Sequence, residues 1–440
     1  MKRFLTLAFT LVLLWVLLPR GTLGLSPVEE LASPYRFQLV QWEVANFPGK
    51  WLYKVRDLLP GGHRDRGVRL EEVRQFFHLG REIRRMEDEL RRAVARSGTA
   101  SSSEVRQLEE TLQPLQARQA SLGARIEEVL EGEMTTALAQ EGLTSRVGTL
   151  FPPVDFAFDR PPSVLVVSPR DRIESLEQVL LRPGMAVAET ESLEETILKG
   201  HDLAALVVGT GGLSTYPSVI PATYDLEGVL VAALHEWLHQ FFYFRPLGRN
   251  YARSLEMTTL NETMADLASQ ELADVVYQAI TGQPRARDSA SGSPAQGEEE
   301  GFDFDREMRR TRLRVDELLA QGRVEEAERY MEERRRLFVE QGYYIRKLNQ
   351  AYFAFHGTYA DSPASVSPIH GELEELRALS PSVGEFIRTV ARFSSYQEFQ
   401  AYLAQARQAP RVERHSLSPE PSRFPLFLQR VSLYEGSPGR

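Results

Sequence analysis

The 440-residue chain contains no cysteine, which excludes disulfide bridges, thiolate metal sites and cysteine nucleophiles together. Any metal must therefore be held by histidine, aspartate or glutamate side chains. Positive charge is in deficit: 52 Lys and Arg against 61 Asp and Glu give a net charge of −9, which argues against a nucleic-acid partner. Apolar residues make up 42% and charged residues 26%, as in ordinary soluble domains, so most of the chain should fold.

The N-terminus carries an apolar run that is too short for a comfortable membrane span. The run from Phe4 to Leu18 has 15 residues, whereas a bilayer requires about 20. Lys2 and Arg3 precede it, as in the cationic start of a signal peptide. Residues 1–25 are therefore predicted to be a signal peptide or an N-terminal membrane anchor that places the body outside the cytoplasm, membrane-anchored or secreted. A buried N-terminal helix is the alternative.

The next part of the chain is predicted to be a connecting segment followed by a long helical hairpin. Residues 26–66 are rich in aromatic side chains and form the connecting segment. Over residues 67–145, apolar side chains recur at intervals of three and four on both sides of a Gly/Ser-rich linker. This pattern predicts an antiparallel, coiled-coil-like hairpin, which serves either as a solvated spacer or as an arm for self-association.

The remaining chain mixes short strands with helices. Within 146–282, strands are expected at Val164–Val167, Met185–Ala188 and Leu203–Val208, and helical patterns follow from Leu226. Residues 283–301 are polar and lack apolar periodicity, which predicts a disordered linker; 302–409 are helical again and 410–440 form an irregular tail. The expected class is therefore α+β and helix-rich, with an N-terminal helical hairpin, a small β-sheet beside the helix that starts near Leu226, and a C-terminal helical region.

The segment with the clearest chemistry is the pentapeptide from His235 to His239, an HExxH pattern. On a helix, residues four apart share a face, so both imidazoles can converge on one metal ion. Glu236 lies one position round the helix, beside the metal, where a base for metal-bound water would stand. With only nitrogen and oxygen ligands on offer, zinc is the expected metal. The alternative is that both histidines merely pack in a core.

A third ligand is expected on the following helix. Glu262 lies 23 residues after His239, which leaves room for a loop and a returning helix. Asp266 is four residues further and shares its face, where a carboxylate can accept the outer N–H of a ligand histidine and fix its tautomer. The alternative for Glu262 and Asp266 is a solvated acidic helix face.

These residues resemble the gluzincin zinc metallopeptidases, the thermolysin-like clan. The resemblance covers roughly 226–271 and rests on HExxH together with a downstream Asn261-Glu262-x-x-x-Asp266. It implies that His235, His239 and Glu262 bind zinc and that Glu236 is the general base. It further implies that Asp266 and Asn261 lie behind the ligands and support them.

Two further regions extend the resemblance loosely. The stretch from 348 to 359 is similar to the C-terminal part of aminopeptidases of that clan, which makes Tyr359, or alternatively His356, the expected donor to the substrate carbonyl. The 203–208 run resembles the edge strand along which clan members align an extended peptide. The glycines that follow it, Gly209, Gly211 and Gly212, are then substrate-binding positions.

The function expected from the sequence is zinc-dependent hydrolysis of peptide bonds in a peptide or protein substrate, outside the cytoplasm. Two other classes stay open. One is a catalytically degenerate protein that keeps its metal for stability and binds partners through the hairpin. The other is a membrane-tethered scaffold without metal.

Overall fold

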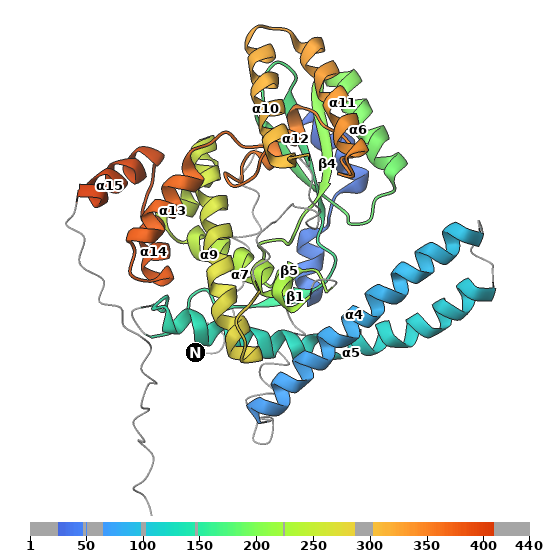
Figure 1. The fold of residues 1–440 in the computed structure, drawn as a ribbon, viewed down its shortest axis with the longest axis vertical. Helices are drawn as coiled ribbons and strands as arrows, with labels where there is room; N and C mark the ends of the chain where they lie inside the picture. Colours follow the sequence, from blue (N-terminus) through green and yellow to red (C-terminus); the bar gives the residue numbers. More distant parts are fainter. Residues whose placement is uncertain are drawn as a thin grey trace, which may run out of the picture.

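The computed structural model describes residues 25–46, 50, 65–97, 103–145, 148–222, 225–286 and 302–408. Figure 1 shows a helical body, a two-helix hairpin that projects from it, and a small sheet flanked by helices. The helix-rich α+β class expected from the sequence is confirmed. Residues 1–24, most of the expected linker and the whole expected tail lie outside the described residues. Within the described ranges, no helix combines the length and apolarity needed to cross a membrane.

Along the described chain helices come first, the strands and one helix follow between residues 156 and 220, and helices alone make up the rest. The elements are α2 (Pro27–Ala32), η1 (Ser33–Tyr35), α4 (Arg66–Ser97), α5 (Ser103–Gln140), β1 (Phe156–Phe158), β2 (Ser163–Pro169), β3 (Glu177–Leu181), α6 (Val187–His201), β4 (Leu203–Gly209), β5 (Ser218–Ile220), α7 (Leu226–Tyr243), α8 (Pro246–Arg249), η2 (Tyr251–Arg253), α9 (Leu255–Thr281), α10 (Phe304–Ala320), α11 (Val324–Glu340), α12 (Gln350–His356), α13 (Ile369–Leu379), α14 (Val383–Val390) and α15 (Tyr396–Gln408).

Helices α4 and α5 form the hairpin and pack along each other (Figure 1). Its outer part is held by a small cluster of Leu79, Ile83 and Leu112. Its base is different, because side chains such as Ile126 and Leu130 belong to the same buried core as α7 and α9. Each such side chain contributes about 1.5–3 kcal/mol when fully buried. The base of the hairpin is therefore part of the body's core.

The sheet has the strand order β3-β2-β4 and is antiparallel throughout. Side chains alternate between its two faces. Val164, Val166 and Leu206 pack against α12, whereas Leu165 and Val167 pack in the cluster that includes α6 and α2. A separate parallel pair joins β1 to β5.

The strand expected at Met185–Ala188 is wrong. Gly184 has a positive φ of 71° and turns the chain into α6, which begins at Val187. Glu189 accepts a hydrogen bond from the backbone N–H of Ala186 at 3.0 Å and so caps that helix. Local capping chemistry therefore decides the conformation, and the third strand of the sheet lies earlier, at Glu177–Leu181.

Helices α7 and α9 lie side by side in the main core. Asp225 caps α7 by accepting a 2.8 Å hydrogen bond from the N–H of Gly228, and Ser254 caps α9 in the same way. Between them, Gly248 allows a close approach, because a Cβ there would lie 2.3 Å from the carbonyl of Phe242. Short connections therefore bring the two helices together.

The C-terminal helices divide between two cores. Helices α10 and α11 pair with each other around Met308, Val315 and Phe338. Helices α13, α14 and α15 pack on α9 through residues such as Phe386 and Phe399, which belong to the main core. Helix α12 lies beside α10 and against the sheet (Figure 1), and its Phe353 belongs to the same core as α10 and α11.

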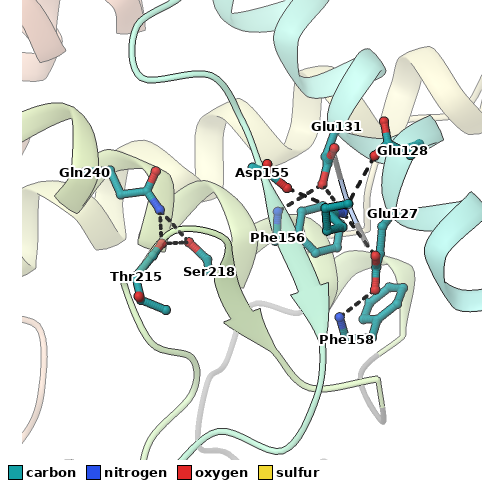
Figure 2. Close-up of polar contacts among 10 residues, drawn as sticks. Glu127, Glu128, Glu131, Asp155, Phe156, Phe158, Thr215, Ser218 and Gln240 are labelled. Carbon is teal, nitrogen blue, oxygen red and sulfur yellow. Dashed lines mark hydrogen bonds and ion pairs between the residues drawn. The ribbon is translucent and has the colours of Figure 1, made fainter. Parts of the chain in front are cut away.

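A buried ion cluster ties the hairpin to the body. The Lys50 ammonium lies 2.6 Å from Glu131 and 3.0 Å from Glu127, both on α5, and 3.5 Å from Asp155. Burial alone would lower the pKa of Lys50, but these carboxylates raise it above its usual range. Figure 2 shows the two glutamates also accepting hydrogen bonds from the backbone at β1. The cluster therefore fixes α5 to the first strand.

Candidate metal centre

Helix α7 brings the two histidines of the HExxH pattern together. His235 and His239 stand one turn apart, and their Nε2 atoms are 3.0 Å from each other. The helix is held in this orientation by its opposite, buried side, where the indole N–H of Trp237 donates a 2.9 Å hydrogen bond to the carbonyl of Pro152. Both imidazoles are therefore presented on one face.

Helix α9 supplies a carboxylate to the same point. Oε2 of Glu262 lies 3.7 Å from Nε2 of His235 and 3.4 Å from Nε2 of His239. Three ligands bound tetrahedrally at 2.0–2.2 Å from one ion are about 3.3 Å apart. The three donor atoms thus have the chemistry and the spacing that one divalent cation requires, and they are the metal-capable group found within the described ranges.

Two neighbouring side chains orient these ligands. Nδ1 of His239 donates a 2.8 Å hydrogen bond to Oδ1 of Asn261, so Nε2 is the ring nitrogen that faces Glu262 and that a metal would take. The hydroxyl of Tyr251 donates a 2.5 Å hydrogen bond to the other oxygen of Glu262. Asp266 stands on the far side of His235, with Oδ1 3.9 Å from Nδ1, beyond hydrogen-bonding distance.

The electrostatics of the centre are strongly coupled. Burial would lower the pKa of His239, but the carboxylate of Glu262 raises it to about 9. Burial would raise the pKa of Glu262, and the two histidines instead hold it well below its usual range. Burial and the neighbouring Asp361 carboxylate raise the pKa of Asp266 to about 7. A cation at this point would replace the proton on His239 as the partner of Glu262.

Glu236 is buried beside the ligands. Only 8% of the residue is exposed, and burial raises the pKa of its carboxyl. Gly212 packs directly against it: a Cβ on that glycine would lie 2.5 Å from Oε1 of Glu236. The loop from 212 to 218 is itself tied to α7. The hydroxyl of Ser214 donates a 3.0 Å hydrogen bond to the carbonyl of Glu236. The side-chain amide of Gln240 donates to the carbonyl of Thr215 and to the hydroxyl of Ser218 (Figure 2). The loop and helix α7 therefore form one wall of the site.

The centre opens into a cleft of about 1540 Å³. Its lining includes all the residues expected at the site except one: Gly209, Gly211, Gly212, His235, Glu236, His239, Asn261, Glu262, Asp266 and Tyr359.

Tyr359 and His356, the two expected donors, have different surroundings. Tyr359 lines the cleft together with Glu236 and Glu262, and burial and these two carboxylates raise its pKa well above its usual value. His356 instead packs against Tyr352, with ring centroids 4.3 Å apart, and burial lowers its pKa to about 4. The structure therefore brings Tyr359 to the cleft, and His356 is not among the described residues that line it.

Other cleft residues were not expected from the sequence. Tyr251 comes from the connection between α7 and α9, where an aromatic residue in an otherwise polar loop was the available signal. Leu39 and Glu43 reach the cleft from a helical segment at 39–46, and Glu43 hydrogen-bonds Thr215. No local pattern marks either of those two residues. Comparisons with protein-family models, with curated proteins and with solved structures found no match.

Proposed function

We propose that this protein is a zinc-dependent metallopeptidase of the gluzincin type that cleaves peptide bonds outside the cytoplasm. The observation that carries the proposal is the convergence of His235, His239 and Glu262 on one point, with the buried carboxylate of Glu236 in the same cleft. The extracytoplasmic location rests on the cationic start and apolar run of residues 1–25.

Three of the chain's own side chains would hold the metal: the two imidazoles through Nε2 and Glu262 through Oε2. When bound, zinc supplies a Lewis acid that acidifies a water molecule and polarises a carbonyl group. Asn261 keeps His239 in the tautomer that a ligand needs, and Tyr251 holds the carboxylate of Glu262 in place.

Glu236 acts as the general base. It removes a proton from the attacking water and then delivers that proton to the leaving amine. Burial raises its pKa toward the working pH, which favours both halves of the transfer. Tyr359 stays protonated, because its pKa is raised, and its hydroxyl donates a hydrogen bond to the substrate carbonyl oxygen as negative charge develops there.

The test is the substitution Glu236→Gln, with Glu256→Gln on the exposed first turn of α9 as the matched control. Hydrolysis of a mixed peptide library should fall about 10²–10⁴-fold in the first variant and stay unchanged in the second. Zinc content, measured by mass spectrometry of the metal, should remain at one ion per chain in both.

Each other class predicts a different result. Full hydrolysis by the Glu236→Gln variant would remove Glu236 as the base. One tightly held zinc with no hydrolysis by the unmodified protein would indicate the catalytically degenerate class. The scaffold class predicts that the protein is purified without metal and that a chelator leaves its melting temperature unchanged.

A further inference from the structure

The outer edge of β4, which faces away from β2, is closed along much of its length. The N–H of Val207 donates a 2.7 Å hydrogen bond to Glu194, and its carbonyl accepts one of 3.2 Å from Arg346. One rung earlier, the carbonyl of Ala205 accepts a 3.0 Å hydrogen bond from Asn349. Side chains therefore occupy the backbone groups that another extended chain would need.

This closure is firmly built. The side chain of Glu194 is 1% exposed and receives two hydrogen bonds from Arg346, at 2.5 and 3.0 Å, and one of 3.0 Å from Lys347. Such a buried, multiply bonded ion pair holds its geometry, because removing one partner would leave a charge buried without compensation. The carboxylate on α6 and the guanidinium before α12 thus act together as a cap on β4.

The opposite edge of the sheet is covered as well. The N–H of Phe37 donates a 2.9 Å hydrogen bond to the carbonyl of Leu180, and the N–H of Arg182 donates one of 2.7 Å to the carbonyl of Tyr35. The N-terminal segment therefore runs along β3 as a short extra rung. Neither edge offers a long free ladder.

One short stretch of edge remains beside the candidate metal centre. Successive residues of a strand present their backbone groups to alternate edges, so Gly209 follows Val207 on the outer edge. Gly209 is exposed and lines the cleft, and the open stretch continues to Gly212, against Glu236. At Leu213 it ends, because that residue exchanges two hydrogen bonds with Val219.

We infer that the cap formed by Glu194 and Arg346 limits how many substrate residues can pair with the edge of β4. The protein is then selective for the length of the peptide on one side of the cleaved bond. This inference rests on the proposed function. Three residue steps separate Gly209 from Gly212, at most about 10 Å of extended chain. About three substrate residues on the β4 side of the cleaved bond can therefore form main-chain hydrogen bonds with this edge. Substrate residues further from the cleaved bond on that side form none.

The first experiment measures this limit in the unmodified protein. Internally quenched peptides share one central sequence and carry one to six residues on either side of the cleaved bond, which mass spectrometry locates. On one side, kcat/KM should rise with each residue up to about three and then stay level. Continued gains of threefold or more per residue on both sides would overturn the inference alone. If no peptide is cleaved, the proposed function fails, and this inference fails with it.

The second experiment removes the cap. The double substitution Glu194→Ala with Arg346→Ala frees both backbone groups of Val207, which adds up to two hydrogen bonds and a gain on the order of tenfold in kcat/KM for longer peptides. Peptides with three residues or fewer on that side should be cleaved as before. The matched control is Glu195→Ala with Lys199→Ala, which removes an exposed pair on the same helix.

The outcomes separate cleanly once folding is checked by circular dichroism. A folded double variant that gains nothing for longer peptides would overturn the role of Glu194 and Arg346. The same gain in the control pair would overturn it equally, because it would show a general loosening of α6. If the double variant does not fold, the length series in the unmodified protein decides.

Discussion

The contact between Gly212 and Glu236 allows a sharp test of the site. A methyl group at position 212 would lie 2.5 Å from Oε1 of Glu236, about 0.9 Å short of the 3.4 Å at which ordinary contact begins, and 2.9 Å from its Cγ. The backbone of Gly212 does not require glycine for its φ, so Gly212→Ala should fold. Because Cγ and Cδ of Glu236 also lie at 2.9 and 3.0 Å from that methyl group, the whole side chain has to shift within the cleft, and not the carboxylate oxygen alone.

A displacement of about 1 Å in a catalytic group costs about 10²-fold in rate, or about 2.7 kcal/mol of transition-state stabilisation. We therefore expect Gly212→Ala to lower kcat about 100-fold on a short quenched peptide, with zinc content unchanged. The control is Gly200→Ala on α6, where a Cβ meets nothing within 4 Å and alanine favours the helix.

Two results would refute this reasoning. A Gly212→Ala variant with kcat within threefold of the unmodified protein would show that the position of Glu236 does not control the rate. Loss of zinc from the variant would show that the loop supports the metal ligands rather than the base. Metal analysis and steady-state kinetics on the same sample distinguish the two.

The ligand supports and the buried ion cluster give three further predictions. Tyr251→Phe removes the hydrogen bond to Glu262 and should weaken zinc binding about 10–100-fold in a chelator competition, whereas Tyr344→Phe, at an exposed position, should not. Below pH 9, zinc must displace the proton that Glu262 stabilises on His239. Calorimetry should therefore show proton release on zinc binding, and the zinc affinity should fall about tenfold for each pH unit by which the pH is lowered. A pH-independent affinity would contradict this. Lys50→Met should lower the free energy of unfolding by about 3–5 kcal/mol in urea, and Lys199→Met, in an exposed pair, should leave it unchanged.

The parts of the site that share a helix could be predicted from the sequence. His235, Glu236 and His239 lie within one turn and a half, so their relation follows from helical geometry alone. The spacing to Glu262 required one further assumption, that the next helix returns alongside, and the structure places it so. Periodicity likewise indicated the hairpin, although α5 ends at Gln140, before the expected boundary at 145.

Contacts between segments far apart in the chain could not be predicted in this way. Glu194 and Arg346 are 152 residues apart, and neither stands out in its own helix or loop. Lys50 is separated from Glu127 by 77 residues, and its neutralising role depends on how α5 meets β1. The error at 185–188 has a different origin: the short apolar run resembles a strand, but the glycine turn before it and the glutamate cap after it start a helix.

The outer part and the base of the hairpin pack in different clusters, and this difference determines how much of the hairpin could be removed. The outer cluster of Leu79, Ile83 and Leu112 holds only the two hairpin helices to each other, whereas Ile126 and Leu130 pack in one buried core with α7 and α9. The hairpin could be shortened from its tip and rejoined with a short turn while the core beneath α7 and α9 stays intact. A deletion that removes Phe76 would instead expose the shared core to water and remove the packing that supports α7, the helix that carries both histidines.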